Sequence, residues 1–227
     1  MRASKYLALS VFLVGVLVFA RYSMADQIKV GDWIKISVDG KHGSWITDLG
    51  WAGEIGVDAQ DVNGNPIPGF TTFCVEIGSP ITPGEWYQVK GISDQSYDPP
   101  NALTSQTAYL YSSYLDGTLG SYFTDHENAA AEALQYAIWH FQGQTFVDPT
   151  DSLVLSLYND FITYGNNANG GYYGIAILNM DYEKDGQVIH VQDLLSPTAP
   201  VPEPATVLLL GSGLAGLSWY RRRKNKS

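Results

Sequence analysis

The two ends of the chain are apolar segments with basic residues beside them, and they confine the folded body to the residues between. At the start, two basic residues precede the apolar stretch 6–20, and Ser23 and Ala25 supply the small residues that a signal peptidase reads. The pattern predicts a secretory signal peptide over residues 1–25. An uncleaved anchor is the alternative, because the charge of Arg21 lies close to the cleavage position.

The body between the two ends must fold around an apolar core without help from disulfides. The chain of 227 residues contains one cysteine, Cys74, so an intramolecular disulfide is impossible. With 45% hydrophobic residues, a chain of this length can bury one sizeable core. We therefore expect a single ectodomain over residues 26–196, with its thiol buried, paired with another chain or chemically masked.

The charge of this body excludes one class of partner. Residues 26–200 carry five lysines, no arginine and 22 acidic residues. Such a surface repels phosphate backbones and anionic lipid. Nucleic-acid binding is therefore excluded, and we expect the body to be soluble.

Apolar residues alternate along three segments of the first half, as they do on half-buried strands. These segments are 33–38, 55–59 and 71–76, and the last of them contains Cys74. Asn63-Gly64-Asn65-Pro66 is a turn signal between the second and the third, which predicts a hairpin.

The middle of the chain is predicted to be helical. Apolar spacing predicts helices over 104–115 and 126–141, and Asp148 followed by proline predicts the start of a third helix that continues to Tyr164. Thr124 lies three residues before a glutamate, which is the spacing of a capping box at the start of the second helix.

Strand character returns after the helices. It covers 173–179 and 188–191, around a hairpin turn at Lys184-Asp185-Gly186. Strands, then helices, then strands predict an α+β fold, either a β-sandwich or a barrel with an inserted helical subdomain.

Cys74 and Gln135 belong to the two most specific motifs of the body. Cys74 lies in Phe-Cys-Val-Glu on a predicted strand, and Gln135 lies in Gln-Tyr-Ala-Ile-Trp on a predicted helix. This pair of motifs resembles the bacterial thioester domains of surface adhesins, although Val75 stands where those domains usually have an aromatic residue. The resemblance implies that the thiolate attacks the glutamine carbonyl with loss of ammonia, which leaves an acyl group activated toward a lysine on a target.

The alternative interpretation of this pair is structural. A buried cysteine is a small apolar residue, and a helix glutamine can bond to backbone. Glu76 lies on the same strand face as Cys74, where it would assist proton transfer or, more simply, be a solvated acid.

Other chemistry is weakly indicated. The four histidines show no metal-ligand spacing, and His140 is expected at the surface. Residues 181–186 resemble the start of a calcium loop, but Gln192 stands at the twelfth position, where a glutamate is needed, so a hairpin is favoured. We expect no catalytic residue, no metal and no cofactor.

The end of the chain, residues 197–227, has three parts in order. A linker leads into a Pro-Glu-Pro motif, an apolar segment over 205–220 follows, and a basic cluster comes last. The motif and cluster residues are Pro202, Glu203, Pro204, Arg221, Arg222 and Arg223. This order resembles the PEP-CTERM sorting signal of Gram-negative bacteria, and an ordinary C-terminal anchor is the alternative.

The sorting resemblance implies partners and a location. It implies an exosortase-type processing enzyme, a transient stage in the inner membrane with the basic end in the cytoplasm, and a final place at the cell surface or outside the cell. We therefore predict a non-enzymatic, exported envelope protein that attaches covalently to amines on a surface or in the extracellular matrix. The alternative is a non-covalent structural or carbohydrate-binding protein of the matrix or biofilm, with a polysaccharide as its target.

Overall fold

The computed structural model describes residues 28–46, 49–79, 81–97 and 100–197, and the predicted signal peptide and sorting segment lie outside these ranges. Within the described part, four helices lie between two groups of strands along the chain. The predicted α+β class is therefore confirmed.

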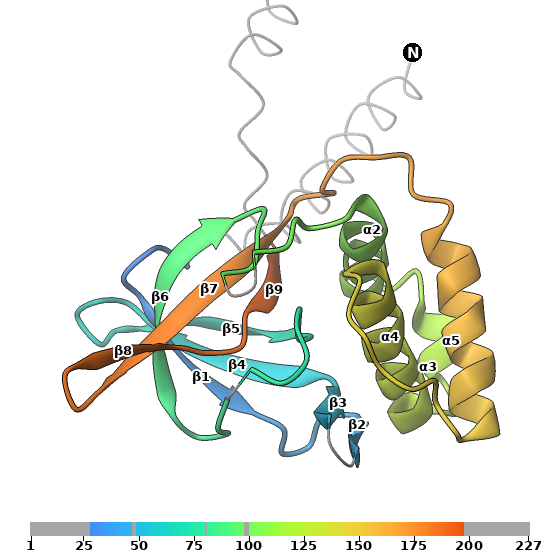
Figure 1. The fold of residues 1–227 in the computed structure, drawn as a ribbon, viewed down its shortest axis with the longest axis horizontal. Helices are drawn as coiled ribbons and strands as arrows, with labels where there is room; N and C mark the ends of the chain where they lie inside the picture. Colours follow the sequence, from blue (N-terminus) through green and yellow to red (C-terminus); the bar gives the residue numbers. More distant parts are fainter. Residues whose placement is uncertain (1–27, 47–48, 80, 98–99, 198–227) are drawn as a thin grey trace, which may run out of the picture. The chain divides into compact units, whose positions relative to one another are not determined.

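One antiparallel sheet makes up one side of the described body, and the helices lie beside it (Figure 1). Its strands follow the order β5-β4-β1-β6-β7-β8, and β9 also pairs with β7. Their bounds are β1 Trp33–Ser37, β4 Ile55–Gln60, β5 Pro66–Thr72, β6 Trp86–Ser93, β7 Ile175–Lys184, β8 Gln187–His190 and β9 Leu194–Pro197. The long β7 pairs with β9 through its first half and with β8 through its second half, so two strands share one neighbour.

The alternation seen in the sequence is the alternation of burial in the sheet. Ile34 and Ile36 of β1, and Ile55 and Val57 of β4, are buried in the core while their neighbours are more exposed. The predicted hairpin between β4 and β5 is confirmed, and its turn is held by the Asp61 carboxylate, which accepts from two backbone N–H groups.

The strand predicted over 71–76 is correct only in part, because β5 ends at Thr72. Beyond that point the chain leaves β4 and pairs with the segment that leads into β9. The Leu195 N–H donates to the Phe73 carbonyl at 3.2 Å, and the Val75 N–H donates to the Asp193 carbonyl at 3.1 Å. Cys74 lies between these two bonds and forms an isolated bridge with Leu194. The segment that follows β5 is therefore hydrogen-bonded to the start of β9 at Cys74.

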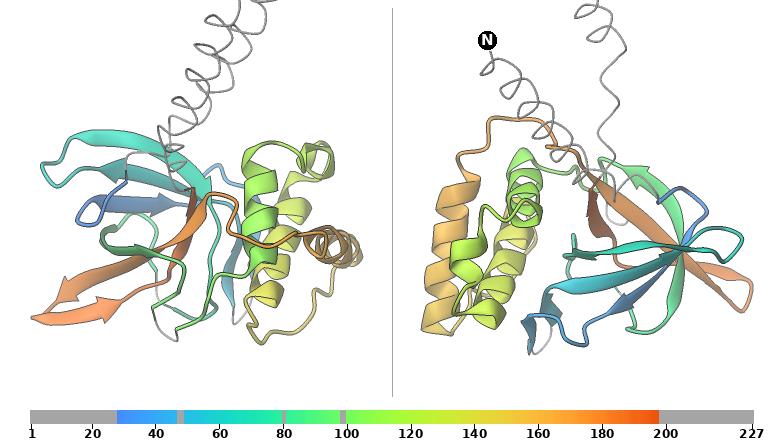
Figure 2. Two further views of the ribbon diagram at one scale, coloured as in Figure 1. Left: turned by 90° about the horizontal axis from the view of Figure 1, so that it is seen from above. Right: turned by 180° about the vertical axis from the view of Figure 1, so that it is seen from behind.

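The helices are inserted between β6 and β7 and lie together on one side of the sheet (Figure 2). Their bounds are α2 Ser105–Leu115, α3 Gly120–Phe123, α4 Glu127–Phe141 and α5 Ser152–Gly165. The fully buried Trp139 and Leu134 belong to α4. That helix packs against α5 and against a separate two-stranded hairpin, β2 (Gly43–Ile46) with β3 (Gly50–Gly53).

Two predicted helix caps are wrong. Thr124 follows α3, and its hydroxyl donates to the Gly120 carbonyl, so it does not cap α4, which begins without a side-chain cap. The third helix is capped by Asp151 instead of Asp148, because the Asp151 carboxylate accepts from the N–H groups of the next turn. The second error arises because Asp148 and Asp151 fit the same local rule.

The turn predicted at Lys184-Asp185-Gly186 is confirmed. Asp185 and Gly186 have φ of 54° and 75°, as a two-residue turn of type I′ requires between β7 and β8. The β2–β3 hairpin, α3 and β9 were not predicted. The hairpin pairs Gly43 with Gly53, and a side chain on either residue would collide with the opposite backbone. These positions therefore need glycine, and the glycines interrupt the apolar alternation by which a strand is predicted.

Candidate functional site

Gln135 and Cys74 are brought together, as predicted from their motifs. The Cys74 N–H donates to Gln135 Oε1 at 2.9 Å, and Gln135 Nε2 donates to the Cys74 carbonyl at 2.8 Å. The glutamine amide is therefore bonded at both of its ends to the backbone of one residue, 61 positions away in the sequence. Both side chains are buried.

A second side chain of α4 continues this contact. The indole N–H of Trp139 donates to the Glu76 carbonyl at 3.1 Å. Residues four apart lie on one face of a helix, so Gln135 and Trp139 project from the same face of α4. Gln135 therefore bonds to the backbone of Cys74 and Trp139 bonds to the backbone of Glu76. These bonds hold the segment that carries the thiol against the middle of α4.

The thiol of Cys74 is held away from bulk water. Its residue is 3% exposed. Burial raises the pKa of the thiol well above its ordinary value, and the neighbouring Glu76 carboxyl raises it further. The resting side chain is therefore a neutral thiol that needs a proton acceptor before it can act as a nucleophile.

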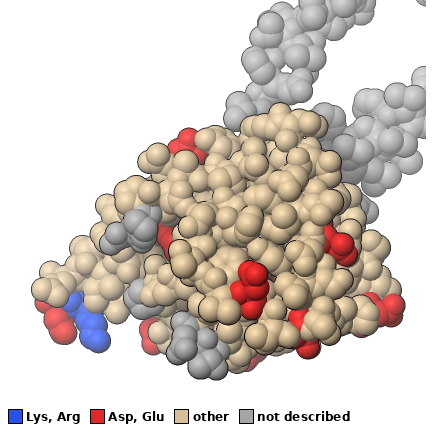
Figure 3. Space-filling view, turned by 45° about the vertical axis from the view of Figure 1, so that its right-hand side comes forward, with Lys and Arg blue, Asp and Glu red and all other residues tan. Residues whose placement is uncertain are grey.

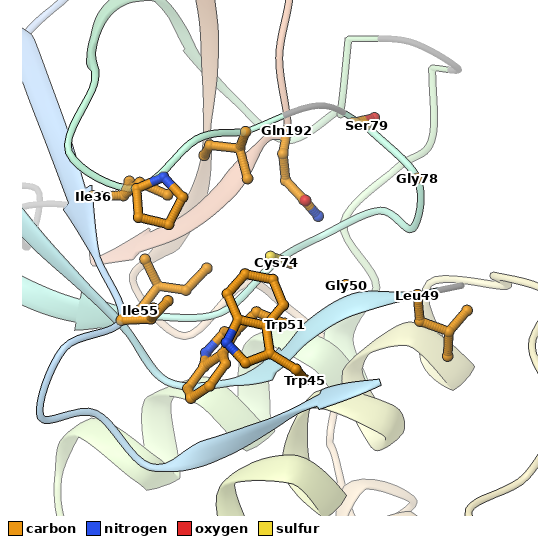
Figure 4. Close-up of a pocket in the computed structure, with 13 residues that line it drawn as sticks. Ile36, Trp45, Leu49, Gly50, Trp51, Ile55, Cys74, Gly78, Ser79 and Gln192 are labelled. Atoms are coloured by element: carbon orange, nitrogen blue, oxygen red, sulfur yellow. The ribbon is translucent and has the colours of Figure 1, made fainter. Parts of the chain in front are cut away.

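A pocket of about 290 Å³ reaches Cys74 from the surface (Figure 4). Its walls are largely apolar, and the side chains of Trp45, Trp51 and Ile55 lie on one side of Cys74 with Gln192 on the other. Trp45 and Trp51 pack edge to face at 5.6 Å between ring centroids. Since no Lys, Arg, Asp or Glu is among the described residues that line the pocket, it favours an uncharged group.

Glu76 is not the solvated acid that the strand pattern favoured. It is 2% exposed, because the chain bends after Cys74 and turns the carboxyl inward. The Asp193 N–H donates to Glu76 Oε2 at 3.0 Å, and the two carboxyl groups share a side-chain hydrogen bond. Glu76, two residues after Cys74, therefore forms a buried pair of acids with Asp193.

The surroundings decide which of the two acids holds the proton. Asp193 accepts from the Tyr97 N–H at 2.6 Å, from Asn179 Nδ2 at 2.9 Å and from the Met180 N–H at 3.3 Å. These donors favour a charged Asp193, although burial still raises its pKa. Burial and the charge of Asp193 raise the pKa of Glu76, so the shared proton resides on Glu76.

Asp193 was missed by sequence reasoning. Its only local signal is that it is an acid directly before the apolar pair Leu194-Leu195. Nothing in the sequence connects it with Glu76, 117 residues earlier.

The remaining candidates have structural surroundings. His140 is exposed, as predicted, and its ring nitrogen bonds the Tyr158 hydroxyl at 3.0 Å. Residues 181–186 form the β7–β8 hairpin, with Asp181 bonded to His190. Across the described ranges, no three acidic, histidine or cysteine side chains are grouped as a metal site would need.

The surface agrees with the acidic composition. On the face in Figure 3, acidic side chains are spread singly among uncharged ones, and basic side chains show only at one extremity. None of the described helices has the length and apolar character that crossing a membrane requires.

Comparison with known protein families confirms both resemblances. Residues 71–167 match the family described as thioester domain, and this segment begins just before Cys74 and contains Gln135. Residues 200–224 match the PEP-CTERM protein-sorting motif, which indicates export and anchoring in a membrane during sorting. No curated protein and no solved structure matches the chain.

Proposed function

We propose that the chain is an exported surface protein whose ectodomain forms an internal thioester between Cys74 and Gln135 and uses it to attach covalently to an amine. One observation carries this proposal: the Gln135 amide is bonded through both its oxygen and its nitrogen to the backbone of Cys74. An amide and a thiol do not condense in open water, and such fixed proximity is what makes the reaction feasible.

The same bonds suggest how the reaction proceeds. The Cys74 N–H that donates to Gln135 Oε1 would stabilise the negative charge that develops on this oxygen when sulfur attacks the amide carbon. The Sγ–Cδ bond forms, the Cδ–Nε2 bond breaks, and the thiol proton leaves with the nitrogen as ammonia. Only one such event occurs in each molecule, so the domain acts as a single-use reagent and not as an enzyme.

The pocket supplies the route for the target. An amine that enters between Trp45 and Gln192 reaches Cys74 from the surface. Attack on the thioester carbonyl frees the thiol and leaves an amide bond between Gln135 and the target. The uncharged walls favour a neutral amine, which is the nucleophilic form.

Sorting would follow the C-terminal motif. The sorting residues would be those of the Pro-Glu-Pro motif, residues 202–204, and of the basic cluster, residues 221–223, with an exosortase-type enzyme as the partner. We expect the mature protein to lack residues 205–227. Peptide mapping of released material tests this, and recovery of peptides from residues 208–219 would contradict it.

Intact-mass measurement tests the thioester. Wild-type protein prepared without amine buffers should be lighter by one ammonia, should resist alkylation while folded, and should form a methylamine adduct at Gln135. Cys74→Ala and Gln135→Ala should each abolish the adduct. A folded wild-type protein at unmodified mass, with Cys74 alkylated after unfolding, would reject the proposal.

A passive matrix protein is the second candidate, and one observation favours it. Gln142, also buried, makes the same kind of bonds to backbone beside Thr104, with no cysteine there. A glutamine that bonds to backbone is therefore also used in this fold for structure alone.

A further inference from the structure

The buried acids Glu76 and Asp193 lie on the two backbone segments that pair beside Cys74. Val75, between Cys74 and Glu76, donates its N–H to the Asp193 carbonyl. Cys74 itself is bridged to Leu194, the residue after Asp193. The acid pair is therefore fixed to the same two segments that position the thiol, and both acids lie on the same side of the bridge, Asp193 one residue from Leu194 and Glu76 two residues from Cys74.

A purely structural role gives no reason for two acids here. Two carboxyl groups out of water carry a large desolvation penalty, and one of them must hold a proton to avoid repulsion. The three donors around Asp193 bond to both of its oxygens and explain an acid there, but glutamine has the shape of Glu76 and could make hydrogen bonds at position 76 without that penalty.

We propose that Glu76 and Asp193 act together as the proton-transfer pair for formation of the Cys74–Gln135 thioester. This inference rests on the function proposed above and adds the groups that move the proton. The reaction needs a proton acceptor for the thiol and a proton donor for the departing nitrogen, and a pair that shares one proton supplies both.

The step is balanced within the protein. The charged carboxyl of the pair accepts the Sγ proton as the Sγ–Cδ bond forms, and the protonated carboxyl donates its proton to Nε2 as the Cδ–Nε2 bond breaks. Ammonia leaves, and the pair keeps the single proton with which it began. Burial is consistent with this role, because it raises the pKa of the thiol, which therefore needs an acceptor for its proton, and it raises the pKa of Glu76, which keeps that acid protonated at neutral pH.

Refolding of the full chain tests the inference. The chain is recovered unfolded with free thiol and unmodified amide, diluted into detergent buffer without amines, and followed by intact mass between pH 5 and pH 9. Wild type should lose one ammonia, whereas Glu76→Gln and Asp193→Asn should each lose it at least about 100-fold more slowly. Glu76→Asp should recover part of the rate. The matched control is Glu54→Gln, since Glu54 is also buried and bonds the Tyr114 hydroxyl away from Cys74; it should react as wild type does.

The outcomes separate the two proposals. A folded wild type that keeps its ammonia overturns both. Ammonia loss at the wild-type rate in Glu76→Gln overturns the proton-transfer pair and leaves the thioester standing. If a variant fails to refold, the wild-type pH profile decides, because a rate that does not change with pH contradicts transfer through a titrating pair, and a rate that falls at both ends of the range supports it.

Discussion

Two buried glutamines of the same helix segment allow the reactive and the structural use of one side chain to be compared. Gln135 lies in the middle of α4, and Gln142 follows two turns later as its C-terminal cap. Each accepts a hydrogen bond from one backbone N–H and donates to one carbonyl: Gln135 at Cys74, and Gln142 at Thr104 and Ala102. Their bonding to backbone is the same in kind.

The difference lies in what surrounds each amide. Gln135 is bonded to the residue that carries the thiol, and two buried acids lie on the segments beside that residue, whereas the side chain next to Gln142 is that of Asn101, which is neutral and donates to the Gln142 backbone carbonyl. Bonding to backbone therefore fixes an amide in place without making it reactive. To react, the amide also needs a nucleophile beside it and a group that accepts the proton of that nucleophile.

The largest expected effect is on covalent labelling. Gln135→Ala should abolish methylamine incorporation, and Gln142→Ala should leave it at the wild-type level. Each variant leaves buried backbone groups without partners, at about 1–3 kcal/mol for each group. Intact mass measures incorporation, and circular dichroism checks that both variants are folded. Loss of incorporation in both would mean that labelling reports only on fold integrity.

The next effect concerns stability. A thioester would link two residues 61 positions apart, and closing a loop of this size in the unfolded chain should stabilise the folded state by about 4 kcal/mol. Opening it with methylamine should lower the free energy of unfolding by that amount, measured by denaturant titration. The same treatment should not change Cys74→Ala, and an equal change there would point to the reagent itself.

A smaller effect should appear with pH. The pKa of Glu76 is raised in the folded state by burial and by Asp193, so the folded protein holds a proton that the unfolded chain releases. Glu76 contributes its full stabilisation to the folded state below about pH 4.5, the ordinary pKa of a glutamate. This contribution declines as the pH rises toward the raised pKa. Asp193 is the titrating side chain that raises this pKa, and Glu76 in turn raises the pKa of Cys74.

Thermal unfolding at several pH values measures this decline. The melting temperature of wild type should be lower at pH 8 than at pH 5, and Glu76→Gln should reduce the difference. Gln142→Ala should lower stability similarly at both pH values, because the partners of Gln142 do not titrate. A wild-type stability that rises from pH 5 to pH 8 would contradict a protonated Glu76.

The smallest effect should come from the pocket wall. Trp45 is 66% exposed, so Trp45→Ala should change the free energy of unfolding by no more than about 0.5 kcal/mol. Methylamine, which is small, should react as before, whereas a lysine peptide should react about tenfold more slowly, since it loses a contact worth about 1.4 kcal/mol. Equal slowing of both amines would show that the substitution disturbs Cys74 itself.

The sequence by itself determined the features that depend on near neighbours. Alternation placed β1 and β4, turn residues placed the hairpin at Asp185, and helical spacing placed α4 within a residue of its bounds. These signals are local, because side-chain direction repeats every two residues on a strand and every three to four on a helix. The two short motifs also indicated that Cys74 and Gln135 meet.

Only the tertiary structure decided the electrostatics of the site. Whether Glu76 is solvated or buried depends on the bend after Cys74, and its partner Asp193 arrives with a strand 117 residues later that the sequence pattern did not reveal. The pKa of an acid depends on burial and on neighbouring charge, and both come from contacts between distant segments. The residues that would react could thus be found from sequence, whereas the groups that would move their proton could not.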